Sequence, residues 1–370
     1  MKFRCERDVL VEALASASRA TSGRERLPVL AGARLAINGD ELRIIATDLD
    51  LTIEVVATVA GIADGVSVIP AKLAADIVRS LEPGAVTIES DEEQAKIASG
   101  RSQFAVRVLP AEEFPMAQGD GGRGEVGSDA VTVASGELAD ALRQVVRAAS
   151  GDEARPILTG VLFMATADGM QLLATDSYRL AVRQLPGVNM VKGEQKVLIP
   201  SRALAELQRL LNGAPECAVR LGTTEASFEV GHVRLTTRLI EGEFPNVLNL
   251  IPASFPNELT VNRDALLDAV KRVKLMVRDQ TTPVRLALRS DGVELMVSNP
   301  AEGTATEDVE AKFLGADMTV AFNPQYLTDG IEAITGDELT LETQDTLKPC
   351  VLRGVGAEEY LYLLMPVRVP

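Results

Sequence analysis

The residue types that usually carry enzyme chemistry are few and scattered in this chain. His232 is the single histidine among 370 residues, and Cys5, Cys217 and Cys350 lie far apart without forming a CxxC pair. One histidine disfavours both histidine metal sites and a Ser/His/Asp triad. Three widely spaced cysteines form no disulfide framework, so the sequence favours a reducing compartment.

Acidic side chains and glycines do not form a recognisable site either. Asp48 and Asp50 would share one face of a strand, but no third metal ligand accompanies them. No GxxxxGK[ST] motif occurs, which argues against a P-loop ATPase. The glycine-rich stretch 119–127 does not open a helix after a buried strand, so it is typical of a linker. We therefore expect no catalytic residues, no metal and no cofactor.

The overall composition is that of a globular protein with a strong acidic bias. Hydrophobic residues make up 46% of the chain, and 37 Lys and Arg against 53 Asp and Glu give a net charge of −16. This charge argues against a simple basic DNA-coating protein unless the cations gather on one surface. The N-terminus has no apolar signal region and no run of 18 apolar residues occurs, so we expect a cytoplasmic protein without a membrane span.

An internal repeat gives the organisation of the chain. Amphipathic helices are predicted over 7–14, 135–142 and 263–270, and their equivalent leucines are 128 residues apart. Each helix is followed in the same order by a proline-led strand, an Asn-Gly or Asp-Gly turn and a second helix with a leading proline. We predict an α+β fold of three tandem domains, each with two helices and about eight short strands. Their boundaries are placed at 1–126, 127–254 and 255–370.

Charge is distributed unevenly between the predicted helices and the rest of the chain. Six helical stretches together carry a net charge of +3, which leaves −19 for the strands and loops. One reading is that the helices carry ordinary solvated ion pairs. The other is a ring or trough in which helices form a mildly basic wall facing DNA phosphates and acidic sheets lie outside. The last predicted helix, 325–336, has no cation and weakens the second reading.

Several short motifs, taken together and in order, carry a family resemblance. They are the turn 27–30 (LPVL), the run 174–182 (ATDSYRLAV), the corner 243–245 (EFP) and the end segment 362–368 (YLLMPVR). Over the entire chain these resemble the bacterial DNA polymerase III beta subunits, the sliding clamps. The resemblance implies a head-to-tail homodimer that closes a ring around double-stranded DNA, with helices inside and sheets outside. It also implies a non-enzymatic processivity factor that slides without reading sequence.

The resemblance implies three sets of site residues. Cations that would contact the duplex are Arg24, Lys72, Arg79, Arg155 and Arg202. At the dimer interface, Phe104 and Val106 of one copy would meet Met276 and Val277 of the other. A pocket for partner peptides would combine Leu158, Thr175, Ser177, Tyr178, Arg179, Leu180, Pro245, Asn249, Leu250, Pro349, Leu363, Leu364, Met365, Pro366, Val367, Arg368 and Val369. In this pocket Arg179 and Arg368 would rim an apolar groove.

The partners implied are the polymerase III alpha subunit, the clamp loader delta subunit, other polymerases and repair proteins. Ser177, Tyr178 and Asn249 depart from residues common in the family, which leaves peptide preference open. Two alternatives also remain open at this stage. One is a clamp paralogue conferring resistance to a clamp-directed antibiotic. The other is a ligand-binding protein or enzyme built on a triplicated α+β domain, which would need convergent polar groups that the sequence does not offer.

Overall fold

The computed structural model describes residues 1–21, 27–115, 130–190, 195–279 and 282–368. Within these ranges the chain forms three successive α+β repeats, as the sequence predicted, each with two α-helices and eight or nine strands. By internal contacts the chain divides into two compact units. The first unit is 1–138 with 206–239, and the second is 139–205 with 240–370.

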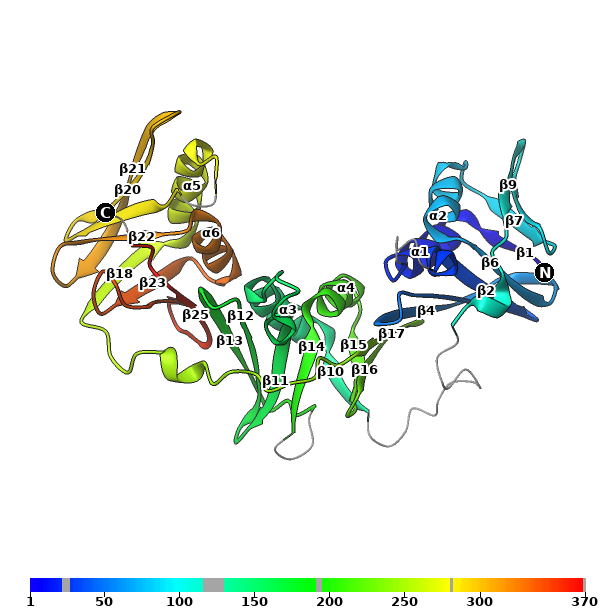
Figure 1. The fold of residues 1–370 in the computed structure, drawn as a ribbon, viewed down its shortest axis with the longest axis horizontal. Coiled ribbons are helices and arrows are strands. Elements are labelled where there is room, and N and C mark those ends of the chain that lie inside the picture. Colours follow the sequence, from blue (N-terminus) through cyan, green and yellow to red (C-terminus); the bar gives the residue numbers. More distant parts are fainter. Residues whose placement is uncertain (22–26, 116–129, 191–194, 280–281, 369–370) are drawn as a thin grey trace. The chain divides into compact units, whose positions relative to one another are not determined.

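The first repeat contains nine strands and two helices (Figure 1). Its elements are β1 (Lys2–Glu6), α1 (Arg7–Ser18), β2 (Gly32–Asn38), β3 (Glu41–Thr47), β4 (Leu51–Thr58), β5 (Ala60–Ala63), β6 (Gly65–Pro70), α2 (Ala71–Ser80), β7 (Ala85–Ser90), β8 (Gln94–Ser99) and β9 (Ser102–Arg107). Helices α1 and α2 pack side by side in Figure 1, and α1 presents Leu10 and Leu14, both fully buried, to the core. Burial of such a leucine contributes about 1.5–3 kcal/mol, which explains the amphipathic spacing.

The second repeat contains eight strands and two helices. Its elements are β10 (Val131–Ala134), α3 (Ser135–Val145), β11 (Gly160–Thr166), β12 (Gly169–Thr175), β13 (Arg179–Pro186), β14 (Lys196–Pro200), α4 (Ser201–Leu211), β15 (Glu216–Leu221), β16 (Glu225–Val230) and β17 (Val233–Arg238). In the first two repeats, Pro28 and Pro156 open short 3-10 helices (Pro28–Ala31 and Pro156–Leu158) rather than the strands expected there. A proline has a fixed φ and no N–H for a strand ladder, so the strand begins after the turn.

The third repeat repeats this plan with two side-chain helix caps. Its elements are β18 (Asn257–Asn262), α5 (Arg263–Val273), β19 (Val284–Arg289), β20 (Gly292–Asn299), β21 (Gly303–Leu314), β22 (Met318–Phe322), α6 (Pro324–Ala333), β23 (Glu338–Thr343), β24 (Cys350–Gly354) and β25 (Ala357–Leu364). The Asn262 side chain accepts the N–H of Ala265, and the Asn323 side chain accepts those of Gln325 and Tyr326. Such caps satisfy N–H groups that the first helical turn leaves unpaired.

Strand pairing joins neighbouring repeats into continuous sheets. In the first unit β17 pairs antiparallel with β4, which completes an eight-stranded sheet beside a five-stranded sheet, β5-β1-β7-β8-β9. In the second unit β13 pairs antiparallel with β25, from Arg179 opposite Leu364 to Arg183 opposite Tyr360, within a twelve-stranded sheet. This second pairing brings the end of the described chain onto the second repeat.

Helix α6 approaches the sheet closely because of one glycine. A Cβ atom at Gly330 would lie 2.5 Å from two ring carbons of Tyr362 on β25, so only glycine allows this contact. Tyr362 is almost fully buried beneath the helix. The three cysteines are buried and unpaired. No helix in the described ranges is long and apolar enough to cross a membrane.

Candidate functional site

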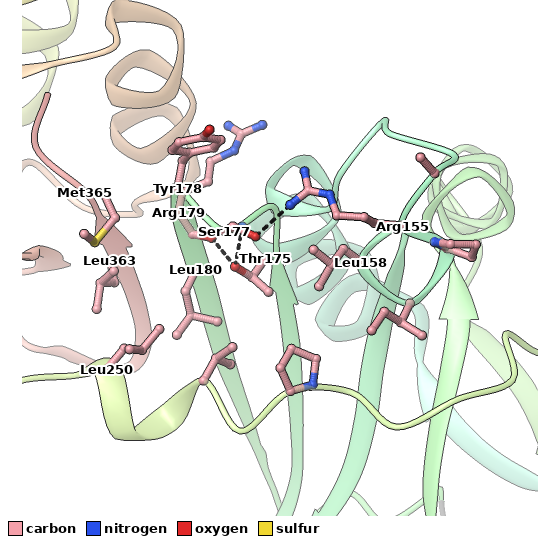
Figure 2. A pocket seen from close by; sticks show the side chains of 15 residues that line it. Arg155, Leu158, Thr175, Ser177, Tyr178, Arg179, Leu180, Leu250, Leu363 and Met365 are labelled. Carbon is pink, nitrogen blue, oxygen red and sulfur yellow. Dashed lines mark hydrogen bonds between the residues drawn. The ribbon is translucent and has the colours of Figure 1, made fainter.

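A cavity of about 620 Å³ lies in the second unit, at the junction of the second and third repeats (Figure 2). Ten residues predicted for a partner pocket line it, together with five others. The lining consists of Ala154, Arg155, Pro156, Ile157, Leu158, Thr175, Ser177, Tyr178, Arg179, Leu180, Pro245, Val247, Leu250, Leu363 and Met365. The β12–β13 turn and the end of β25 therefore form the walls of one site, although they are far apart in the sequence.

The floor of the cavity is apolar and firmly packed. Leu180, Val247 and Leu363 belong to one buried cluster, and Ile157 and Met365 pack against it. Burial of a ligand leucine or phenylalanine on such a surface would contribute about 1.5–3 kcal/mol per side chain. The cavity is thus suited to apolar side chains of an extended ligand.

The turn between β12 and β13 forms one lip of the cavity and is held by its own side chains. The Thr175 hydroxyl accepts the N–H of Ser177 at 3.2 Å and donates to the carbonyl of Arg179 at 2.6 Å. Asp176 Oδ1 accepts the N–H groups of Tyr178 and Arg179 at 2.9 and 3.0 Å. These bonds hold Ser177 at a φ of 80°, which L-residues rarely adopt. Hydrogen bonds within the chain therefore fix the conformation of the lip.

Arg155 spans two loops at the opening of the cavity. Its Nη1 donates to Ser177 Oγ at 3.0 Å, and its Nε donates to Asp152 Oδ2 at 3.0 Å. The structure thus places Arg155 in the pocket lining, whereas the family resemblance implied that this residue contacts DNA. Ala154, Pro156, Ile157 and Val247 were not predicted, although the first three directly precede Leu158, and that proximity was the available signal.

Arg179 lies in the lining but does not form the rim that was expected of it. Its side chain is 9% exposed, and its guanidinium donates to Asp176 at 3.0 Å and to Asp329 at 2.5 Å. Burial alone would lower the pKa of Arg179, but Tyr362, Asp329 and Asp176 together raise it above the ordinary value. The guanidinium therefore stays charged and occupied, and it is not free to hold a ligand.

Seven residues predicted for the pocket are not among its lining residues. Leu364 is 1% exposed and lies on the opposite face of β25 from Leu363, because successive strand residues face opposite sides. The Val367 N–H donates to the carbonyl of Ala321 at 2.7 Å, so this segment follows β22. Val369 lies outside the described residues. The remaining predicted residues that do not line the cavity are Asn249, Pro349, Pro366 and Arg368.

Four of the five cations predicted for DNA contact lie within the described residues, on helices or beside the cavity. Lys72 and Arg79 are exposed on α2, and Arg202 is exposed on α4. Arg79 forms an i,i+3 ion pair with Asp76 at 2.9 Å. Arg24 lies outside the described residues. Their contact with DNA remains a prediction.

Of the four residues predicted for the dimer interface, two lie on an edge strand, and Met276 and Val277 lie at the end of a 3-10 helix. Phe104 and Val106 belong to β9, the outer strand of the five-stranded sheet, and Phe104 is 38% exposed. Met276 ends a short 3-10 helix, and its carbonyl accepts the side-chain amide of Asn299 at 3.1 Å, next to the start of β21. Residues 303–310 of β21 pair only with β20 within the described residues, which leaves their other edge open.

Helix α6 has no cation of its own, and neighbouring elements place cations against it. Arg143 and Gln144 of α3 donate to the carbonyl of Ala333 at the helix C-terminus, at 3.4 and 3.1 Å. The Glu332 carboxylate forms ion pairs with Arg147 at 2.6 Å and with Lys271 at 2.9 Å. Positive groups at a helix C-terminus interact favourably with its dipole and its unpaired carbonyls. The acidic charge of α6 is therefore used in docking against the second repeat and α5.

We expect Glu332→Gln to lower the melting temperature at pH 7 but not in acid. The ammonium of Lys271, assisted by Arg147, lowers the pKa of Glu332 below its ordinary value. A lowered folded-state pKa adds stability above the unfolded-state pKa of about 4.3, and that stability is lost as pH falls through the folded value. Because the side chains of Arg147 and Lys271 are about half exposed, the loss of folding free energy at pH 7 should stay below about 1 kcal/mol.

Thermal melts at pH 7 and at about pH 3 test this expectation. Glu338→Gln, an exposed residue at the start of β23, is the matched control and should change little at either pH. A gap between wild type and Glu332→Gln that stays equal at both pH values would contradict the role given to this ion pair.

Comparisons with known proteins agree along the whole chain. Three successive family models match it: the N-terminal domain of the DNA polymerase III beta subunit over residues 1–118, the central domain over 132–246 and the C-terminal domain over 248–368. The beta sliding clamps of Streptomyces coelicolor and Synechococcus elongatus are 33% and 32% identical to it, with full coverage of both chains.

Solved structures give the same result. The sliding clamp of Bartonella birtlesii bound to griselimycin has a TM-score of 0.92 at 30% identity, with both chains fully covered. The Caulobacter crescentus beta sliding clamp, with polyethylene glycol bound to a putative beta-motif tethering region, has a TM-score of 0.90 at 30% identity. It covers 100% of this chain and 99% of the other.

Proposed function

The chain belongs to the DNA polymerase III beta subunit family, the sliding clamps. From this membership we propose which of its surfaces close the ring, face DNA and bind partner peptides. It is a non-catalytic processivity factor of DNA replication. The proposal that the chain binds partner peptides rests on the apolar cavity, whose lining joins the β12–β13 turn to the end of β25. We assign the three domains to residues 1–126, 127–254 and 255–370, and the protein to the cytoplasm.

We propose that two copies close a head-to-tail ring through their open strand edges. The β9 edge of one copy would pair with residues 303–310 of β21 in the other, which would also cover two exposed edges. The hairpin 96–107 carries three cations and no acid, whereas 303–310 carries three acids and no cation. This charge complementarity favours pairing of β9 with β21 over pairing of like edges.

The helices would line the ring and face the DNA. Exposed cations such as Lys72 on α2 and Arg202 on α4 would approach phosphates without reading bases. The strands and loops, which together carry a net negative charge, would lie on the outside of the ring and repel other DNA. Such loose contacts suit a protein that must slide.

We expect Lys72→Glu and Arg202→Glu to flatten the salt dependence of DNA association. Each phosphate contact that is lost should reduce the slope of log affinity against log salt by about one. The measurement is binding to linear duplex DNA by fluorescence anisotropy across a salt series. Arg289→Glu, which removes an exposed cation on β19, is the matched control. An unchanged slope in the first two variants would show that these helices do not face DNA.

The cavity would receive short apolar peptides from the partners of the clamp. We propose the polymerase III alpha subunit and the clamp loader delta subunit as two of these partners, with other polymerases and repair proteins competing for the same site. The apolar floor would bind ligand side chains, while the exposed Tyr178 and the Arg155 guanidinium at the opening would meet the ligand backbone or polar residues.

Primer extension on a primed circular template tests the proposed function. The assay uses the polymerase III core and clamp loader of the same cell, with and without this chain. Addition of the chain should lengthen the products of a single binding event, because a topological tether keeps the polymerase on its template. Products of unchanged length would contradict the function.

A further inference from the structure

The lip of the cavity is connected to helix α6 by a buried ion pair. Arg179 begins β13 next to the lip, and its guanidinium lies between Asp176 of its own turn and Asp329 of α6, at 3.0 and 2.5 Å. The Tyr326 ring of α6 lies 4.4 Å from the guanidinium carbon, and the Tyr362 hydroxyl is 3.4 Å from Nη1. One cation thus joins the second repeat to the third directly behind the pocket wall.

Asp329 is held in place although it does not line the cavity. Its Oδ2 accepts Arg179, while its Oδ1 accepts the side-chain amide of Gln325 at 2.8 Å and lies 4.0 Å from Arg147. Only 9% of Asp329 is exposed. Because both oxygens are engaged, the carboxylate is a fixed acceptor for the guanidinium and cannot easily turn away.

A second contact braces the same lip against the same helix. Tyr178 is 58% exposed at the cavity, and its ring stacks on that of Tyr326 with centroids 6.3 Å apart. The carbonyl of Tyr326 in turn accepts the buried Tyr362 hydroxyl at 2.9 Å. The lip therefore contacts α6 at two points. Asp176 accepts hydrogen bonds from the backbone of the lip and also from the Arg179 guanidinium, which donates to Asp329 as well.

We propose that Asp329 is a positioning residue for the pocket: through Arg179 it holds the 175–179 turn in its ligand-binding shape. It follows that filling the pocket and docking α6 on the second repeat are thermodynamically linked, and the linkage is reciprocal. Loss of the Asp329 charge would leave buried Arg179 with one carboxylate instead of two, and the turn would move to solvate it. This inference rests on the proposed peptide-binding function.

Glu332 provides a matched control on the same helix. It lies three residues after Asp329 and forms ion pairs with Arg147 and Lys271, neither of which lines the cavity. Glu332→Gln therefore weakens the docking of α6 without altering the partners of Arg179. A general loosening of the helix would appear in both variants, whereas positioning of the lip requires Asp329 alone.

The test is a binding titration of the full-length protein by fluorescence anisotropy. The probe is a fluorescein-labelled peptide, the tightest binder among overlapping peptides of the same cell's polymerase III alpha subunit. We expect Asp329→Asn to weaken binding about tenfold and Glu332→Gln less than about twofold. In an Arg179→Met background, Asp329→Asn should add no further loss, because the two residues act as one unit. Equal weakening by Asp329→Asn and Glu332→Gln would overturn the inference.

Hydrogen exchange on the wild type gives a second readout that depends on no variant. The bound peptide should slow exchange in α6 as well as in the 175–179 turn, because the linkage is reciprocal. Exchange in α6 that does not change on binding would overturn the inference, as would wild-type affinity in folded Asp329→Asn. A wild type that binds no alpha-subunit peptide would instead overturn the peptide-binding function, and the inference with it.

Discussion

Replacing Met365 with lysine should weaken binding of the alpha-subunit peptide at least about a hundredfold, which corresponds to about 2.7 kcal/mol. Met365 lines the cavity, packs against its buried cluster, and donates its N–H to the carbonyl of Tyr178 at 2.9 Å. The side chain is therefore held at the cavity wall. An ammonium there must be desolvated when an apolar ligand fills the cavity, and no acid among the lining residues would compensate it.

The same anisotropy titration measures this loss. Val355→Lys is the matched control, because Val355 is an exposed apolar residue of the third repeat that does not line the cavity. Both variants should keep the native mass of the wild type. Tight peptide binding by Met365→Lys would mean that ligands dock somewhere other than this cavity.

Replacing Phe104 with aspartate should convert the dimer into a monomer. Phe104 lies on β9, whose open edge would pair with β21 of a second copy, and an added acid would face the acidic 303–310 segment. Repulsion between like charges across an interface costs several kcal/mol. The native mass should fall from twice the chain mass to 39.4 kDa, and retention on circular DNA should be lost.

Light scattering across a dilution series measures the mass, and the opposite edge of the same sheet supplies the control. Ile62 on β5 is 60% exposed at the other outer strand, so Ile62→Asp adds the same charge to an edge that is not assigned to the interface. It should remain a dimer. A dimeric Phe104→Asp protein, or a monomeric Ile62→Asp protein, would contradict the interface proposed here.

Local patterns were sufficient to predict the repeated elements. The apolar spacing over 7–14 indicated α1, and the dipeptides Asn38-Gly39 and Asp168-Gly169 lie at the β2–β3 and β11–β12 hairpins, where Gly39 adopts a φ of 57°. These features depend on residues that are close together in the sequence. A hairpin turn and an amphipathic helix can therefore be recognised without knowledge of the tertiary structure.

The connections between repeats could not be predicted in this way. Pairing of β13 with β25 joins residues about 180 positions apart, and no local pattern specifies that register. Arg179 illustrates the consequence. Its position beside the pocket followed from a family resemblance, but its burial between Asp176 and Asp329 depends on a helix from another repeat. The role of the acidic residues of α6 likewise could not be predicted from the helix alone, because it depends on partners in the second repeat and on α5.

Retention on circular and linearised DNA tests most directly the claim that this chain encircles DNA. The protein is loaded onto nicked plasmid by the clamp loader of the same cell and separated from free protein by gel filtration, and half of the sample is then cut with a restriction enzyme. We predict that the protein stays on the intact circle and leaves the cut plasmid, because a sliding ring escapes only over free ends. Equal retention on both forms would contradict encirclement and indicate ordinary surface binding.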